Sequence, residues 1–373
     1  MATDVVIIGA GIVGAACADA CAREGLGVTV VDANGIGSGA TAAGMGHLVV
    51  MDDSEAQFAL TRYSVELWRD LSAELPRDVE YTKSGTIWVA ADEEEQSFLP
   101  AKREYYSSRG VHAEILSAQQ LAAAEPHLRA GLAGGLLVPD DAVLYPPCAA
   151  KFLLAKARSR GAQVGLGKRV AAIERDTVRM TDGTRISSGV FVNATGSAAT
   201  QLTPGAPIRP RKGHLLITDR YAGYVHHQLV ELGYLKSAHS VATDSVAFNV
   251  QPRPTGQLLI GSSRQFGSAD RAIDSKILAK MLDRAGEFMP GLGGLSTIRT
   301  WTGFRAATPD KLPMIGPWPG HDRLYIAAGH EGLGITTSLA TGQLLADELM
   351  QRESKIPRIP YAAGRTFHEH GAN

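Results

Sequence analysis

The stretch VVIIGAGIVGAACADACAREGLGVTVVD, residues 5–32, constrains the fold more than any other part of the chain. Its first four residues are continuous and β-branched, as in a buried parallel strand. The glycine pattern G-x-G-x-x-G follows, and then a helix is expected over about residues 12–23, ended by Gly25. A second strand is expected over residues 27–31. This strand–turn–helix–strand order predicts an α/β domain that binds a dinucleotide.

Each residue of this motif has an expected role. Gly9 and Gly11 allow a tight turn and a close approach of the backbone to a pyrophosphate, and Gly14 lets the helix pack on the strand. The helix start at Ile12 and Val13 directs N–H groups at the phosphates. Asp32, 18 residues beyond Gly14, is placed to accept ribose hydroxyls and would repel the extra phosphate of NADP. A glycine-rich turn without a ligand is the alternative.

Three further segments favour FAD over NAD. GIGSGATAAGMGHL (35–48) is a loop of small residues that can lie against a large flat cofactor. VFVNATGSAA (190–199) is a buried strand followed by a turn, and LYIAAGHEGLGITTSLATGQLLADEL (324–349) reads as strand, glycine turn and helix. A cofactor contacted from both ends and the middle of the chain must be long, which fits FAD better.

These segments resemble the D-amino acid oxidase (DAO) family of FAD-dependent amine oxidoreductases, which includes glycine oxidase and sarcosine oxidase. The resemblance rests on GAGIVG, GSGATAAGMG, NATG, QLLIGSS, GFRAATPDKLPMIG (303–316) and AGHEGLGIT (328–336). Within the family, GMGHLVVMDDSEAQFALTRYS and LLIGSSRQFG look most like the β-type subunits of D-hydroxyproline, proline and opine dehydrogenases.

The resemblance implies an α/β, overall α+β, fold in which a Rossmann-like FAD domain is interleaved with an antiparallel-sheet substrate domain. The FAD domain is expected to use residues 1–48, 140–205 and 320–373, and the substrate domain residues 49–139 and 206–319. Short strands flanked by turn residues suit the antiparallel sheet: GTIWVAA, GHLLITD, SVAFNVQ and GQLLIGSS. A helix is expected over PPCAAKFLLAKARSRGA (146–162) and another over KILAKMLDRAGEFMPGL (276–292).

The family pattern also implies which residues contact the flavin nucleotide. FAD is expected to be held without a covalent bond, because no cysteine lies in the C-terminal part where sarcosine oxidases attach it. The implied contacts are Gly9, Gly11, Ile12, Val13, Gly14, Asp32, Ala33, Ser38, Gly39, Thr41, Ala42, Gly44, Met45, Gly46, His47, Val170, Ala194, Thr195, Gly196, Gly303, Arg305, His330, Gly332, Leu333, Gly334, Ile335 and Thr336.

Oxidation of an amino acid at its α-carbon needs a carboxylate clamp more than acid–base groups, because the flavin takes the hydride. Arg305 is the expected clamp, since its planar guanidinium matches a carboxylate bidentately. The resemblance places it where the family has a carboxylate-binding arginine. The alternative is a surface or interdomain salt bridge.

Other polar side chains have more than one interpretation. His47 follows the flavin loop and either tunes flavin or substrate protonation or is an ordinary packed residue. His330 is expected mainly to pack or to position backbone. Lys212 and His214 either border the pocket or form an exposed strand end. Tyr224 and Tyr234 lie in a loop able to cap the site.

The chain departs from the sarcosine-oxidase pattern at two places. Leu259 stands where those proteins carry an oxygen-activating lysine, and Gly332 and Thr336 stand where a second cation often binds the carboxylate. We therefore expect first an amino-acid dehydrogenase that oxidises D-hydroxyproline, or another small cyclic, secondary or D-amino acid, and passes electrons to partner subunits, a quinone or a dye. The alternatives are a glycine- or sarcosine-type oxidase that makes peroxide, and a flavin subunit inactive without partners.

Composition limits the remaining classes. The formal net charge is −1, so neither nucleic acid nor an anionic membrane is favoured as a partner. Cys17, Cys21 and Cys148 are too few and too widely spaced for a disulfide scaffold or metal site, and the first two are expected to be core residues. Without a visible secretory signal or membrane-length apolar run, we expect a cytoplasmic protein.

Overall fold

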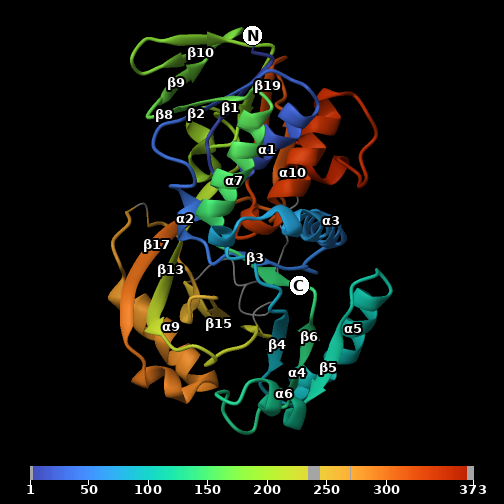
Figure 1. Cartoon of the computed structure of the whole chain (residues 1–373), viewed down its shortest axis with the longest axis vertical. Helices are drawn as coiled ribbons and strands as arrows, with labels where there is room; N and C mark the ends of the chain where they lie inside the picture. The colour runs from blue at the N-terminus through green and yellow to red at the C-terminus, as the bar shows by residue number, and fades with distance from the viewer. Residues whose placement is uncertain (1–2, 234–243, 269, 368–373) are drawn as a thin grey trace. The chain divides into compact units, whose positions relative to one another are not determined.

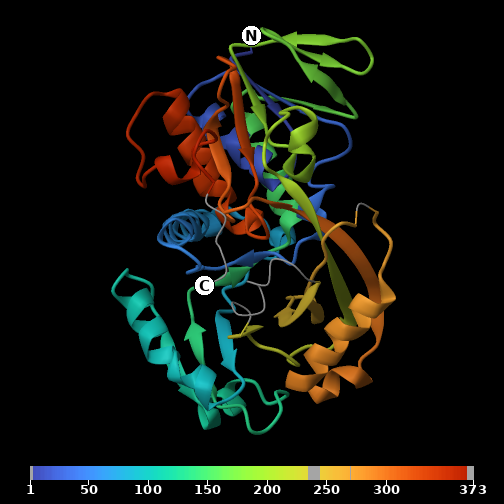
Figure 2. The same ribbon diagram turned by 180° about the vertical axis from the view of Figure 1, so that it is seen from behind.

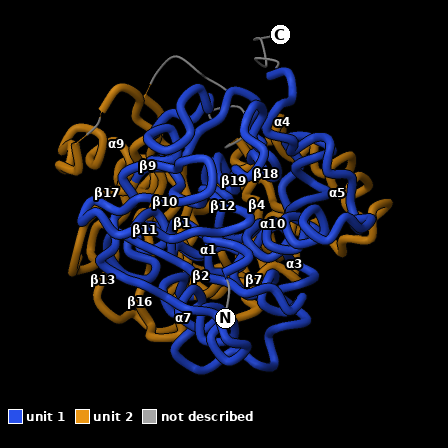
Figure 3. The backbone as a smooth tube through the Cα atoms, turned by 90° about the horizontal axis from the view of Figure 1, so that it is seen from above, with its two compact units in different colours: residues 1–79, 145–210, 304–373 blue, residues 80–144, 211–303 orange. Residues whose placement is uncertain are grey.

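The computed structural model describes residues 3–233, 244–268 and 270–367 (Figures 1 and 2). The chain forms two compact units, coloured separately in Figure 3. Unit 1 comprises Met1–Val79, Tyr145–Pro210 and Phe304–Asn373, and unit 2 comprises Glu80–Leu144 and Arg211–Gly303. Each unit therefore combines segments that are distant in the sequence.

Unit 1 is built on a six-stranded sheet with the order β18-β19-β12-β1-β2-β8. All neighbouring pairs are parallel except β18 and β19, which are antiparallel. Burial on both faces is what makes the first strand a continuous apolar run. The strands are β1 (Val5–Ile8), β2 (Val28–Asp32), β8 (Gln163–Leu166), β12 (Val190–Asn193), β18 (Met314–Pro317) and β19 (Leu324–Ala328).

Helix α1 (Ile12–Arg23) is the central helix of unit 1 and packs on α10 (Gly334–Leu349) and α7 (Pro146–Ser159) (Figure 1). Its small side chains allow close packing. A Cβ atom on Gly342 of α10 would lie 2.5 Å from the Ala16 carbonyl oxygen, so only glycine permits this approach. Cys17 and Cys21 are fully buried here, as the sequence predicted.

The rest of unit 1 consists of shorter elements and one further long helix. Ser54 caps α3 by accepting a hydrogen bond from the Gln57 amide at 3.1 Å. These elements are α2 (Ala40–Ala43), β3 (His47–Leu48), α3 (Glu55–Leu71), the antiparallel trio β9 (Val170–Ile173), β10 (Thr177–Met180) and β11 (Arg185–Ser187), and the 3₁₀ turns η1 (Ser72–Glu74), η2 (Arg77–Val79), η3 (Gly196–Gln201) and η5 (Ile359–Tyr361).

Unit 2 is built on an eight-stranded sheet with the order β17-β13-β16-β15-β14-β4-β6-β5. Its pairs are mostly antiparallel, as expected, but β14 and β4 run parallel, which the sequence did not predict. The strands are β4 (Thr86–Ala90), β5 (Glu114–Ser117), β6 (Gly134–Val138), β13 (Arg209–Arg220), β14 (Gln228–Glu231), β15 (Ser245–Pro252), β16 (Gln257–Arg264) and β17 (Thr297–Ala307). The two-residue strand β7 (Ala142–Val143) also lies in this unit.

Helix α9 (Ser275–Phe288) covers part of this sheet, packing on β15 and β16. Asp274 caps it by accepting from the amides of Lys276 and Ile277. The expected helix continued to residue 292, but a 3₁₀ turn, η4 (Pro290–Gly294), replaces its last turn because proline cannot continue the helical bonding. The other helices are α4 (Glu93–Ser97), α5 (Leu99–Ser107) and α6 (Ala118–Ala124).

The α/β fold predicted from the sequence, with a Rossmann-like sheet and a mostly antiparallel sheet, is therefore confirmed. The assignment of the units to cofactor and substrate stays a prediction. Helix α3 belongs to unit 1, whereas the sequence grouped residues 49–79 with the substrate domain. Among the described residues, no helix combines the length and apolar character needed to cross a membrane.

Candidate active site

The turn between β1 and α1 has no room for side chains. Gly9 has a φ of +115°, and a Cβ atom there would lie 2.5 Å from the Ala194 carbonyl oxygen. A Cβ atom on Gly14 would lie 1.9 Å from the Gly9 carbonyl oxygen. Both positions require glycine, so the turn packs tightly against the end of β12.

The N-terminus of α1 is arranged to receive an anion. Gly11 is its N-cap and has no side chain to bond the first helical amides. Thr41 Oγ1 accepts the Ile12 amide at 3.0 Å, and the helix's own bonding begins with the Ala15 amide, which donates to the Gly11 carbonyl. Amides left at a helix start, together with the helix dipole, favour a phosphate group.

Asp32 is oriented at the end of β2 by two backbone hydrogen bonds. One carboxylate oxygen accepts the Ala10 amide at 2.7 Å, and the other accepts the Asn34 amide at 2.7 Å. A carboxylate has about four acceptor positions. Lone pairs therefore remain on Asp32 for the hydroxyls of a ribose, and the site fits the pyrophosphate and ribose of a dinucleotide.

The small-residue loop and the start of α10 are in direct contact. A Cβ atom on Gly44 would lie 2.5 Å from Ile335 Cδ1. The Thr336 hydroxyl donates to the His47 carbonyl at 2.8 Å. Segments almost three hundred residues apart in the sequence thus form one wall of unit 1.

Asn193, which the sequence did not single out, organises the NATG turn. It is fully buried, and its Nδ2 donates to the Ala199 carbonyl and to Thr203 Oγ1. Its Oδ1 accepts from the amide and hydroxyl of Thr195. The turn of Ala194, Thr195 and Gly196 therefore has a defined shape. An asparagine at the end of an apolar strand was the available signal.

Arg305, on β17, lies against the glycine turn that precedes α10. A Cβ atom on Gly332 would lie 3.3 Å from Arg305 Nε. The Glu331 amide donates to the Ala306 carbonyl at 2.9 Å, and Glu331 has a φ of 53°. The sequence does not predict that a non-glycine residue adopts a left-handed backbone conformation.

His47 is electrostatically coupled to Arg305. Its Nε2 atom is buried, although the residue as a whole is partly exposed. Burial and, secondarily, the positive charge of Arg305 lower the pKa of His47 to about 3. At neutral pH the pair therefore consists of a permanent cation and an uncharged imidazole.

His330 is buried in unit 1. It is 7% exposed, and its Nε2 lies 3.0 Å from Thr341 Oγ1 of α10. Burial lowers the pKa of His330 to about 3, so the ring is neutral at physiological pH. The packing role expected from the sequence stays a prediction.

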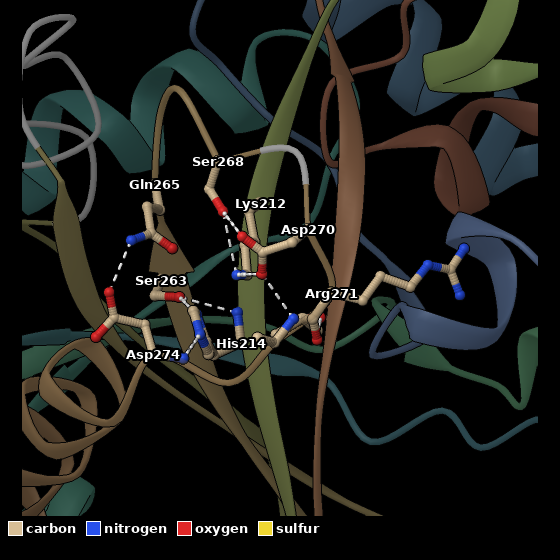
Figure 4. A network of polar contacts seen from close by, with 10 residues as sticks. Lys212, His214, Ser263, Gln265, Ser268, Asp270, Arg271 and Asp274 are labelled. Atoms are coloured by element: carbon tan, nitrogen blue, oxygen red, sulfur yellow. Dashed lines mark hydrogen bonds and ion pairs between the residues drawn. The ribbon is translucent and has the colours of Figure 1, made fainter.

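Lys212 and His214 belong to a polar network of unit 2 (Figure 4). Both are buried, so the interpretation as an exposed strand end is wrong. Lys212 Nζ contacts Ser268 and Asp270, and the His214 ring contacts Ser263 Oγ and accepts the Asp274 amide. The network secures the loop before α9.

The sequence placed Tyr224 and Tyr234 in a loop able to cap the site, and the structure describes the first of them. Tyr224 stacks on His127, with ring centroids 3.8 Å apart, and packs against the core of unit 2. Tyr234 lies outside the described residues.

Unit 1 contains the expected flavin contacts with one exception, Gly303, the last residue of unit 2. Most of them lie where strands of the parallel sheet end or where helices begin, whereas Val170 and Arg305 lie on strands of other sheets. They are Gly9, Gly11, Ile12, Val13 and Gly14 after β1 and in the first turn of α1; Asp32 and Ala33 at the end of β2; Ser38, Gly39, Thr41, Ala42, Gly44, Met45, Gly46 and His47 around α2; Val170 on β9; Ala194, Thr195 and Gly196 after β12; Arg305 on β17; and His330, Gly332, Leu333, Gly334, Ile335 and Thr336 before and within α10.

A sequence profile of the family described as FAD dependent oxidoreductase matches residues 4–348. The chain belongs to this family. Among its relatives, glycine oxidase of Geobacillus kaustophilus is 26% identical over 97% of both chains. Hydrogen cyanide synthase subunit HcnC of Pseudomonas aeruginosa is 27% identical over 97% of this chain and 96% of that protein. An opine oxidase subunit of Rhizobium meliloti is 26% identical over 92% of this chain and 95% of that protein.

Solved structures share the fold over nearly the whole chain. The crystal structure of glycine oxidase from G. kaustophilus superposes with a TM-score of 0.87, 26% identity and coverage of 98% and 99%. That of L-proline dehydrogenase from P. horikoshii gives a TM-score of 0.87 at 24% identity, with 97% of each chain covered.

The protein is thus an FAD-dependent oxidoreductase of the DAO family. The residues present fit FAD: the glycine turn and α1 N-terminus would hold the pyrophosphate, and Asp32 the ribose. When bound, FAD supplies a ring that accepts a hydride. Gly44, His47, Ile335 and Thr336 form a wall of unit 1. His47, in this wall, is electrostatically coupled to Arg305.

Proposed function

We propose that this protein is an amino-acid oxidase of the glycine or sarcosine type, using molecular oxygen as electron acceptor. The observation that carries the proposal is that Arg305 lies against Gly332 and is electrostatically coupled to the neutral His47, in the unit that contains the dinucleotide turn. The glycine oxidases of G. kaustophilus and P. aeruginosa, 26% and 27% identical over nearly the full chain, support it. They favour an oxidase over the dehydrogenase that the sequence suggested first.

In the proposed reaction, an amino acid loses a hydrogen with its electron pair from Cα and a proton from nitrogen, giving an imine. Water hydrolyses the imine to a 2-oxo acid and ammonia. When the substrate is N-substituted, the products are a 2-oxo acid and an amine. Oxygen receives the two electrons and two protons and becomes hydrogen peroxide. The Cα–H bond must be held at a fixed orientation for this transfer.

Arg305 would provide that orientation by binding the substrate carboxylate with two parallel hydrogen bonds. His47 would stay uncharged beside it, because burial and Arg305 disfavour its protonation. The small residue at position 332 leaves space next to the guanidinium, since an added Cβ atom would contact Arg305. A small substrate with one carboxylate suits this arrangement.

The deciding experiment combines anaerobic reduction with oxygen addition. FAD-loaded protein would be mixed without oxygen with glycine, sarcosine, D-proline or D-hydroxyproline, and flavin bleaching followed by absorbance. Air-saturated buffer would then be added. Glycine or sarcosine should bleach the flavin, and oxygen should reoxidise it as fast as substrate reduces it, with one peroxide per substrate. Slow reoxidation would exclude the oxidase.

A dehydrogenase for D-hydroxyproline or a related cyclic amino acid is the second candidate, and Leu259 favours it. This residue is 5% exposed on β16, paired with Ile217 and Gln251, and offers no cation to assist oxygen reduction. Two relatives are named as subunits, HcnC and the opine oxidase subunit, so partner subunits or a quinone would take the electrons. Rapid bleaching, slow reoxidation in air and turnover restored by a dye would identify this activity.

A flavin subunit that is inactive alone would give another result. No amino acid would bleach the flavin of the isolated chain, while dithionite would still reduce it. Bleaching would then appear only with a partner present.

A further inference from the structure

Unit 2 contains a groove of about 660 Å³ that none of the predicted site residues lines. Its floor is apolar and formed by the sheet and η4: Leu216, Ile260 and Leu292 are 3%, 2% and 8% exposed. Helix α9 forms one wall, and Leu295 and Thr297, where β17 begins, form another. The volume falls within the range of about 300–1,000 Å³ found for small-molecule sites.

Two glycines line the groove at positions where neither the backbone conformation nor a close neighbouring atom requires glycine. Gly286 lies within α9 and Gly293 within η4, and both line the groove. Neither has a positive φ, and a Cβ atom on either would meet nothing within 4 Å. Glycine inside a helix is destabilising relative to alanine. Backbone conformation and packing thus do not explain Gly286, whereas the space it leaves does.

The wall formed by α9 is acidic. Asp283 and Glu287, one helical turn apart, both line the groove. Glu287 forms an ion pair with Arg284, which is also paired with Glu231. Within the described part of the chain the side chain of Asp283 has no ion pair or hydrogen-bond partner, so its carboxylate is available to a ligand.

We propose that this groove binds an organic cation with an apolar body, such as an alkyl or aryl amine. The apolar body would cover Leu216, Ile260 and Leu292, and the ammonium group would face Asp283 and Glu287. An amino-acid substrate would not suit the groove, because its carboxylate would be repelled there. The site is independent of the proposed oxidase activity and binds a ligand of a different charge class.

The test uses 4-phenylbutylamine and 4-phenylbutyrate, which share one apolar body and carry opposite charges. Binding to the FAD-loaded full chain would be measured by calorimetry, without turnover. The amine should bind saturably at one site and the acid at least 5-fold more weakly. Asp283→Asn should weaken the amine about 2–5-fold, as expected for one exposed ion pair. Asp283→Lys should reverse the preference.

Neighbouring glycines offer a matched control. Gly293→Ala and Gly286→Leu place atoms in the groove and should weaken the amine at least 5-fold. Gly294→Ala makes the same chemical change one residue away, in open space outside the groove, and should leave binding unchanged. Equal binding of amine and acid, or no effect of Gly293→Ala and Gly286→Leu, would overturn the proposal.

Two other results would also overturn it. Displacement of the amine by an amino acid that bleaches the flavin would place it in the active site instead. Binding of a Leu-Arg-Leu peptide without binding of the amine would make the groove a docking surface for a polypeptide. Since calorimetry does not depend on turnover, failure here leaves the proposed oxidase activity untouched.

Discussion

At the scale of single residues, the most informative side chain is Arg305. It lies against Gly332, and its permanent positive charge, together with burial, keeps the His47 ring neutral. The guanidinium of Arg305, which is partly exposed, suits a carboxylate better than a lysine would, because its planar fork forms two aligned bonds.

We predict that Arg305→Ala retains FAD but lowers kcat/KM for the amino acid by on the order of 10²-fold or more, as expected for loss of a charge-assisted bidentate contact. Arg305→Lys should recover part of this loss. Steady-state kinetics and the flavin spectrum measure both effects. Arg299→Ala, which removes an exposed arginine from the same strand, is the control and should leave kcat/KM unchanged.

His330 predicts an acid-dependent loss of stability. Its pKa is about 3 in the folded protein against an ordinary value of 6.5, so between these values only the unfolded chain binds the proton. The contribution of His330 to the free energy of unfolding is therefore fully present above pH 6.5, and it is lost progressively as the pH falls toward 3. His330→Gln should flatten the pH dependence by up to about 1.4 kcal/mol per pH unit.

Urea unfolding at several pH values measures this slope. His112→Gln, at an exposed position, provides the comparison and should leave the slope close to that of the parent. An equal slope in the parent and in His330→Gln would show that the His330 ring is not kept neutral by folding. The pKa of His47 is also lowered. His47 therefore adds to the pH dependence of unfolding in the parent, in His330→Gln and in His112→Gln alike.

At the scale of elements, the two helix glycines Gly342 and Gly286 have opposite meanings. Gly342 permits the close approach of α10 to α1, because a Cβ atom would lie 2.5 Å from a backbone oxygen that cannot move alone. Gly286 lies in open space on α9. The same substitution should therefore have opposite effects.

We predict that Gly342→Ala destabilises the protein by about 1–3 kcal/mol, the usual cost of overpacking a core. Gly286→Ala should stabilise it by up to about 1 kcal/mol, because alanine is the better helix former. Thermal or urea unfolding of both variants measures the difference. A stabilised Gly342→Ala protein would mean that α1 and α10 are not packed as closely as described.

At the scale of the whole molecule, FAD is expected to be held by contacts from segments throughout unit 1, without a covalent bond. We predict that acid or heat releases all flavin into the supernatant, leaving a colourless precipitate. Cys148, partly exposed on α7, is the cysteine most accessible to attachment among the three. Cys148→Ser should therefore retain as much flavin as the parent; flavin remaining on the precipitated chain would contradict the prediction.

Bound FAD should also stabilise the fold, since a ligand that binds only the native state raises the unfolding free energy with its concentration. Adding FAD to the apoprotein should raise Tm, and the increase should grow with FAD concentration. Gly9→Ala should abolish the increase, because a side chain there meets the Ala194 carbonyl and requires an unfavourable φ.

The sequence alone determined the parallel β1–α1–β2 unit, because a glycine spacing, a helical stretch and a terminal acid are all local patterns. It also identified four of the eight strands in the sheet of unit 2, β4, β13, β15 and β16, because their turn residues and apolar runs are local too. Resemblance across the ordered motifs then identified the family and its cofactor, which the match over residues 4–348 bears out.

Only the tertiary structure decided which distant residues meet. The hydrogen bond from Thr336 to the His47 carbonyl, the contact of Gly332 with Arg305 and the parallel pairing of β14 with β4 join segments with no pattern in common. The structure also decided that Lys212 and His214 are buried. The sequence did not, because the residues at a strand end follow the same pattern whether or not a loop covers them. Long-range contacts depend on how elements pack, and that packing is not encoded in the spacing of residues within any one element.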